Sequence, residues 1–361
     1  MIGSEPWATL SRLGEGQFSS QVLSRPFVYP DIPLTLPGSS SLNPNAGLGL
    51  GRDTAYPEKD SPSWFVRPET WVMEHSLPGA CPAPAVVAKK FLRGVLFMCQ
   101  EWVKKGSNSF IHAQLYRNGL PSCLQDAFTT LSAYISRTPA TEDLVLQIVE
   151  DRANSLLAQP APGEDQRANT IAHLSRVQAL LIYQVIRLLD GCVRQRALAE
   201  GIIPVLFSWG HEMLDSAKTL YVSHRAAESS IPDGQDGYNA RAELWRSWIL
   251  LESVRRTWLA MAFTQNIYLI MKDGWAECTG SVSFTARKGL WEANSAATWT
   301  DLCRSKDPWM VPALRGERLF SHDQMDDVDE FGCHLWIVIG AVDKAQSWLD
   351  RSQRRLGVVL V

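Results

Sequence analysis

The pattern of apolar positions predicts a chain built from helices. From Trp64 onward, apolar residues recur every three or four positions in one segment after another, which places them on one face of an α-helix. The segments lie at about residues 86–102, 124–135, 141–156, 171–188, 205–224, 240–271 and 323–349. No stretch shows the alternation of apolar and polar residues that a half-buried strand needs. The pattern therefore predicts an all-α fold, an irregular bundle of about eight helices.

Residues 1–62 differ from the rest of the chain. Prolines recur through this segment, at positions such as Pro26, Pro30 and Pro37, and they alternate with glycine and serine. Proline removes a backbone donor and glycine adds conformational freedom, so neither favours a helix. We therefore expect a poorly ordered N-terminal arm over residues 1–62 and a helical domain over residues 63–361.

The composition and the charge narrow the class of protein. Hydrophobic residues make up 45% of the 361 residues and charged residues 20%, which is the balance of a globular protein that can bury a core. The formal net charge is -3, so no bulk positive field draws the chain to nucleic acid. The longest apolar stretches are far shorter than the roughly 20 residues that cross a bilayer, and we expect no membrane contact.

An acidic cluster, Asp326-Asp327-Val328-Asp329-Glu330, offers the one catalytic hypothesis. Its Asp-Asp-x-x-Glu spacing resembles the magnesium-binding motif of terpene cyclases, in which carboxylates on one helical turn hold Mg²⁺ against a diphosphate. Acidic residues also gather in the first turn of a helix because they complement the helix dipole. We favour this second interpretation, which predicts no metal site and no cofactor.

Other signatures of catalysis or metal binding are absent from the sequence. The two closest cysteines, Cys81 and Cys99, are 18 positions apart, whereas structural zinc sites use closely spaced ligands. No Gly-x-Ser-x-Gly motif and no phosphate-binding glycine loop ending in Lys-Ser/Thr occurs. We therefore expect a protein that is not an enzyme.

One helical segment stands out by its tryptophans and its paired charges. On a helix, Glu252 reaches Arg256 one turn later and Arg255 three positions later. Trp245 and Trp248 lie on one face of that helix, and arginine side chains stack on tryptophan rings. These features predict a buried helix whose charges are satisfied within the segment.

The same segment resembles the central helix of the regulatory region of fungal binuclear zinc-cluster transcription factors. The matching pattern is Trp-x-x-Trp-x-x-x-Glu-Ser-x-Arg-Arg-Thr. Phe284-Thr285-Ala286 and the residues after it resemble the stretch that follows this helix in the family. The resemblance assigns a structural role to Trp245, Trp248, Glu252, Arg255, Arg256, Leu290, Trp291 and Trp299.

The zinc cluster of that family is missing from this sequence. In the family, six closely spaced cysteines bind two zinc ions and a helix contacts DNA, whereas no cysteine precedes Cys81 here. The resemblance therefore implies a nuclear regulator of a fungal secondary-metabolite gene cluster that reaches DNA indirectly or through a zinc cluster encoded upstream. It leaves three routes open, among which no sequence feature chooses: the chain pairs with a protein partner or a second copy of itself, it binds a small-molecule effector, or it is a shortened gene product.

Two other functions compete with transcriptional regulation. The acidic cluster and the aromatic-rich core suggest an all-α, Mg-dependent enzyme of terpene-cyclase type, whose core would line an apolar pocket. A non-catalytic interaction protein would need neither the acidic motif nor a route to DNA. Isolation of native partners separates this last function from regulation, because co-purification with a zinc-cluster protein favours regulation.

Overall fold

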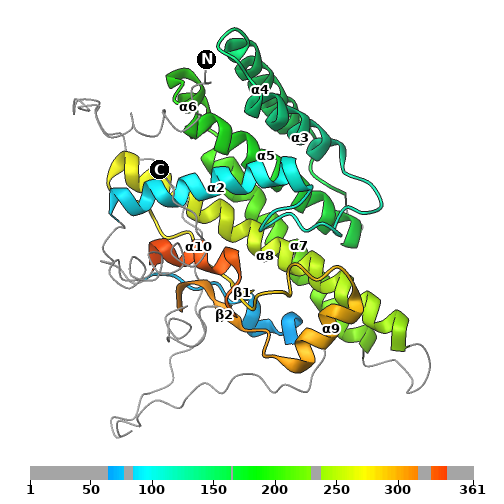
Figure 1. Ribbon diagram of the computed structural model, residues 1–361. Helices are drawn as coiled ribbons and strands as arrows, with labels where there is room; N and C mark the ends of the chain where they lie inside the picture. Colours follow the sequence, from blue (N-terminus) through cyan, green and yellow to red (C-terminus); the bar gives the residue numbers. More distant parts are fainter. Residues whose placement is uncertain (1–63, 77–83, 164–165, 229–236, 316–326, 340–361) are drawn as a thin grey trace, which may run out of the picture. The chain divides into compact units, whose positions relative to one another are not determined.

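The computed structural model describes residues 64–76, 84–163, 166–228, 237–315 and 327–339. Within these residues the predicted all-α fold is confirmed (Figure 1). The helices are α2 (Ala85–Lys105), α3 (Ser122–Ile135), α4 (Glu142–Leu157), α5 (Gln166–Leu189), α6 (Val193–Glu200), α7 (Ile203–Glu228), α8 (Gly237–Asp273), α9 (Ala296–Ser305) and α10 (Glu330–Ile339). Two short 3₁₀ turns, η2 (Trp64–Val66) and η3 (Pro68–Trp71), precede α2. The predicted N-terminal arm, residues 1–62, lies outside the described residues.

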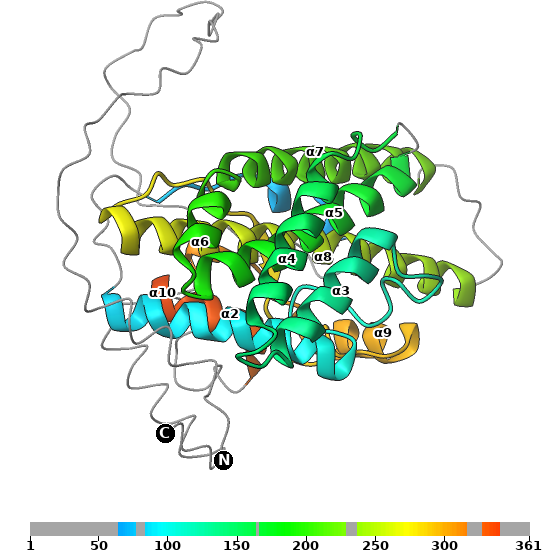
Figure 2. The same ribbon diagram turned by 90° about the horizontal axis from the view of Figure 1, so that it is seen from above.

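Helix α5 is the centre of the helical core. Every residue from 173 to 190 is buried, because α3, α4, α6, α7 and α8 all pack against it (Figure 2). A helix enclosed in this way is apolar on more than one face, and α5 carries runs such as Ala179-Leu180-Leu181-Ile182. None of the described helices combines the length and the apolar character needed to cross a lipid bilayer.

Helix α8 links this core to the rest of the described chain. Residues 247–262 are all buried, and α8 packs against α2, α5, α7 and α9. Helix α10 in turn packs on α2, at the side where α2 also faces α8 (Figure 1). The predicted helix over residues 240–271 is therefore present, and its middle lies in the interior.

The described residues also contain one small sheet, which no alternating pattern in the sequence marks. Strands β1 (Ser283–Thr285) and β2 (Met310–Pro312) pair antiparallel, with Phe284 opposite Val311. Each strand has three residues, too few to display an alternating pattern. The residues of β1 are all buried because this strand packs against α8, so no polar face marks it in the sequence.

The last helix begins later than its apolar pattern suggested. A start near residue 323 was expected, but α10 begins at Glu330. Val328 forms an isolated β-bridge with Arg287, and the Asp329 amide donates to the carbonyl of Ala286 at 2.9 Å. These contacts hold residues 327–329 out of the helix, and the expected continuation over residues 340–349 lies outside the described residues.

A glycine allows α2 and α10 to approach each other closely. A Cβ built on Gly94 of α2 would lie 2.1 Å from Cε1 of His334 on α10. The His334 ring is buried and stacks on Phe91, with 4.4 Å between ring centroids. The ring therefore has little freedom to move aside, and the side chain of residue 94 must be a hydrogen atom.

We expect Gly94→Ala to destabilise the protein. Alanine favours a helix over glycine by about 1 kcal/mol, but overpacking a filled core costs about 1–3 kcal/mol. Because His334 is fixed by Phe91, the second effect should dominate, and the free energy of unfolding in a urea titration should fall.

The double variant Gly94→Ala/His334→Ala provides the control. Removal of the imidazole makes room for the new methyl group, so the double variant should be more stable than the sum of the two single changes by about 1 kcal/mol or more. Additive effects would show that the two residues do not meet as described.

Candidate functional site

The residues that carry the family resemblance lie in the buried middle of the fold. All eight are buried: Trp245, Trp248, Glu252, Arg255 and Arg256 on α8, and Leu290, Trp291 and Trp299 after β1. The ring centroids of Trp248 and Trp299 are 5.5 Å apart, and those of Trp248 and Trp291 are 6.3 Å apart. The structure therefore brings the two tryptophans from outside α8 against this helix.

Arg256 lies between two buried carboxylates. Its Nε donates to Oε1 of Glu252, one turn earlier on α8, at 3.0 Å. Its Nη2 donates to Oδ2 of Asp329, just before α10, and to the carbonyl of Thr285 at 2.8 Å. All three charged side chains are about fully buried. The pair within α8 agrees with the sequence analysis, which did not predict the contribution of Asp329.

Thr285 connects Glu252 to strand β1. The Thr285 amide donates to Glu252 Oε1 at 2.8 Å, and its hydroxyl donates to Oε2 at 3.1 Å. Trp248 Nε1 in turn donates to that hydroxyl at 3.3 Å. A buried carboxylate needs donors on both oxygens, and Thr285 with Arg256 supplies them. The helix, the strand and the segment before α10 thus share one hydrogen-bonded network.

Arg255 points to the other side of α8 and is less fully satisfied. Its Nη2 donates to the carbonyl of Phe65 and to the Thr70 hydroxyl at 3.0 Å, and its guanidinium lies 4.0 Å from the centroid of the Trp71 ring. The nearest Glu252 oxygen is 3.8 Å away. Burial lowers the pKa of Arg255 to about 10, and Glu252 opposes this effect only in part.

The charges of this network are balanced. Glu252 and Asp329 offset Arg255 and Arg256 among these buried side chains. Burial disfavours the charge on Arg256, but the adjacent carboxylates raise its pKa. Burial also raises the pKa of Asp329 to about 6, although Arg256 and the Gly332 amide favour the ionised form. Removal of one member would leave its partner buried and unpaired.

The acidic cluster is divided between different partners. Asp327 contacts Arg287 at 2.9 Å and Lys306 at 3.2 Å, and Asp329 points inward to Arg256. Helix-dipole complementarity accounts for Glu330, in the first turn of α10, and for Asp329, whose Oδ1 accepts from the Gly332 amide at 2.8 Å. Asp326 lies outside the described residues, within which no three His, Cys, Asp or Glu side chains converge as a metal ion requires.

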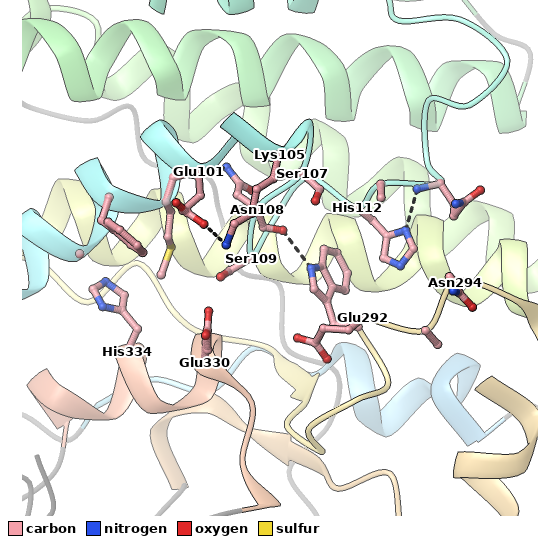
Figure 3. Close-up of a pocket in the computed structure, with 17 residues that line it drawn as sticks. Glu101, Lys105, Ser107, Asn108, Ser109, His112, Glu292, Asn294, Glu330 and His334 are labelled. Carbon is pink, nitrogen blue, oxygen red and sulfur yellow. Dashed lines mark hydrogen bonds and ion pairs between the residues drawn. The ribbon is translucent and has the colours of Figure 1, made fainter. Parts of the chain in front are cut away.

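A pocket of about 410 Å³ lies beside the network. It is bounded by α2, by residues 107–114, by residues 291–294 and by the start of α10 (Figure 3). Trp291 lies between the two features: it lines the pocket, and the Arg256 guanidinium is 4.2 Å from the ring centroid. The carbonyl of Ser109, another lining residue, accepts from Arg256 Nη1 at 3.3 Å.

Comparison with known proteins supports the resemblance found in the sequence. The chain is similar to transcription factor gsfR2 of Penicillium aethiopicum, with 26% identity over 251 residues. The matched region is 69% of this chain and 59% of that protein, so the chain spans about three fifths of the length of the curated relative it matches. No protein-family model matches the sequence, and no solved structure matches it. The resemblance to a fungal transcription factor is thereby confirmed.

We expect Glu252→Ala to destabilise the protein by about 3–5 kcal/mol, because it leaves Arg256 buried with one carboxylate instead of two. The matched control is Glu243→Ala on the same helix, which breaks an exposed pair with Arg246 and should cost about 0–1 kcal/mol. Urea denaturation of the two variants measures the difference. Equal midpoints would show that the network around Glu252 contributes no more than a surface pair.

Stability should fall on acidification because two buried histidines resist protonation. Burial lowers the pKa of His334 to about 3, and burial with the charge of Arg256 lowers that of His112 to about 4. An unfolded histidine has a pKa of about 6.5. The unfolded chain therefore takes up protons that the folded chain does not, and stability declines as the pH drops from about 6.5 toward 4.

The variant His334→Phe isolates one of these contributions. A histidine that stays neutral costs about 2 kcal/mol at pH 5 relative to pH 7, so the loss of unfolding free energy between these pH values should shrink by about this amount. The same pH dependence in His334→Phe and in the unmodified protein would contradict the assignment.

Proposed function

We propose that this chain regulates transcription through its helical domain, residues 63–361, and that its targets belong to a fungal secondary-metabolite gene cluster. The observation that carries the proposal is the similarity to a protein named as a transcription factor, which extends over 251 residues and 69% of the chain. The pattern from Trp245 to Thr257 resembles the regulatory region of zinc-cluster factors. It supports the assignment of the regulatory role to the helical domain.

The contacts of the acidic cluster favour regulation over the terpene-cyclase alternative. Asp327 pairs with Arg287, and Asp329 pairs with Arg256. A carboxylate that is neutralised by an arginine is not free to coordinate a magnesium ion. The side chains of Glu252 and Arg256 are buried and hydrogen-bonded to protein groups, so they are not available to a substrate. These contacts support a role for the motif in the fold rather than in catalysis.

The route to DNA is part of the proposal. The similarity spans 59% of the relative, and the six-cysteine cluster of the resembled family has no counterpart before Cys81. We infer that the helical domain acts in the nucleus together with a group that binds DNA. This group is either a zinc-cluster segment encoded upstream of this chain or a partner protein that carries a zinc cluster. A domain of this kind should act on a promoter wherever it is brought to DNA.

A tethering experiment tests this expectation. The full chain is fused to the DNA-binding domain of a bacterial repressor and expressed in a filamentous fungus with a reporter gene downstream of the matching operator. Reporter transcription should change several-fold relative to the DNA-binding domain alone, and a fluorescent fusion should accumulate in the nucleus.

The matched pair Glu252→Ala and Glu243→Ala serves as the control in the same assay. Loss of the effect in the first variant and its retention in the second would link regulation to the folded helical domain, because only Glu252 belongs to the buried network. An unchanged reporter with a folded, nuclear fusion, together with unchanged transcripts in a strain that lacks the gene, would reject the proposed function.

A further inference from the structure

Helix α2 gathers cationic side chains on one face. Four cations and one aromatic residue share an arc of about 100° on its circumference, at 3.6 residues per turn: Lys89, Lys90, Arg93, Phe97 and Lys104. We call these five residues the basic face. Figure 2 shows α2 at the edge of the helical bundle, and the buried residues of α2 lie on its opposite side. The basic face is about 22 Å long, at 1.5 Å per residue.

The positive charge of this face is concentrated rather than neutralised. Among the residues that the structure describes, Lys89, Arg93 and Lys104 form no ion pair. Helix α2 as a whole carries five cations and one carboxylate, that of Glu101, which pairs with Lys105. Protein surfaces usually intersperse the two signs, and the net charge of the whole chain is -3. A negative chain thus carries one strongly positive helix.

The stability of the helix explains only part of this pattern. Cations favour the last turn because they complement the helix dipole, and Lys104 lies there. Lys89, Lys90 and Arg93 lie in the first half of α2, where the dipole gives cations no advantage. Lys89 and Arg93 are also one turn apart, a spacing at which like charges repel each other. These cations therefore need another explanation, and a negatively charged partner supplies one.

Two apolar side chains are exposed among the cations. Phe97 is 51% exposed, and Val86, one turn before Lys90, is 77% exposed. Phe97 also lines the pocket of Figure 3, so a concavity lies beside its ring. Aromatic side chains are enriched at the centres of protein interfaces, where most of the binding energy resides. The face thus offers an apolar contact together with its charge.

This combination selects the class of partner. The backbone of duplex DNA offers phosphate groups to the cations, but it offers no apolar side chain to Phe97 and Val86. An amphipathic peptide helix with acidic residues on both sides of an apolar stripe offers both kinds of contact. Charge complementarity and the exposed ring together favour the peptide.

We propose that the basic face of α2 binds an acidic, amphipathic helix of a partner protein. Carboxylates of the partner lie against Lys90 and Arg93 before the Phe97 ring and against Lys104 after it, and an apolar side chain between them packs on the ring. A role for this partner in gene regulation rests on the function proposed above, whereas the binding itself does not.

The neighbouring carboxylates limit where the partner lies. Glu292 and Glu330 line the same pocket as Phe97, and Figure 3 shows them across the pocket from α2. Their charge repels an acidic segment. The partner helix therefore stays on the α2 side of the pocket, and only an apolar side chain enters the concavity beside Phe97.

Fluorescence polarisation tests the surface on the purified full-length chain. The first probe is a fluorescein-labelled helical peptide of about 18 residues, long enough to cover the face, with glutamates on both sides of a stripe of leucine and phenylalanine. It should bind with a Kd on the order of 10 μM, as expected for a small interface. A second probe with glutamine for every glutamate, and a third with serine for every apolar residue, should each bind at least about tenfold more weakly.

Charge reversal identifies the cations responsible. Arg93→Glu/Lys104→Glu changes two exposed positions of the basic face, so the variant should fold, and it should weaken binding of the first probe by at least about tenfold. The matched control, Lys218→Glu/Arg304→Glu, makes the same change in net charge at exposed positions on α7 and α9. It should bind the first probe like the unmodified protein.

A second variant tests the apolar contact. Phe97→Ala should weaken binding of the first probe by about fivefold or more, and it should leave binding of the serine probe unchanged because that probe has no apolar side chain to lose. This variant keeps all the charges of the face, so it decides the proposal even if the charge-reversal variant fails to fold, as judged by its melting curve.

The remaining outcomes separate the proposal from its alternatives. A short duplex DNA that binds more tightly than the first probe, equal affinity for the glutamate and glutamine probes, or equal binding by the charge-reversal variant and its control would overturn the proposal. If no peptide binds while the tethered reporter of the unmodified chain still responds, the basic face is rejected and the proposed function stands. Peptide binding with a silent reporter supports the basic face and counts against the proposed function.

Discussion

The arrangement of the described helices depends on how Arg256 is neutralised. A guanidinium in the interior is stable only with charged partners and with acceptors for its remaining hydrogens. Glu252 supplies one partner from the same helix, and Asp329 supplies the second from the segment before α10. The carbonyl of Thr285 completes the set from β1. Helix α8 therefore cannot bury its middle unless these two segments are also in place.

This dependence explains why α8 carries charged residues within a segment that is otherwise apolar and aromatic. Well-packed apolar residues of similar volume are often as stabilising as a buried ion pair, so we infer that the network serves orientation more than stability. Arg256 and Glu252 allow one rotational position of α8 against β1, because hydrogen bonds have strict geometry. The tryptophans around them, Trp248, Trp291 and Trp299, then fill the volume that this orientation leaves.

The sequence predicts the parts of the fold that depend on neighbours in the chain. Apolar periodicity locates the long helices, and α2 ends at Gly106, whose left-handed backbone favours glycine. The pair of Glu252 with Arg256 follows from one helical turn. Asp329 is different because it lies 73 residues from Arg256, and nothing in the acidic cluster distinguishes it from its neighbours. Contacts over such distances depend on topology, which periodicity does not contain.

The pocket also depends on contacts that the sequence pattern does not predict. His112 has no signature in the sequence, and its orientation depends on the loop that directs the Gln114 amide to Nδ1. The wall residue Trp291 was singled out for its resemblance to a known region, and its fixed orientation depends on the carbonyl of Asn108. The Trp291 indole has the Arg256 guanidinium on one side and the pocket on the other, so the same long-range contacts that fix the buried network also set this wall of the pocket.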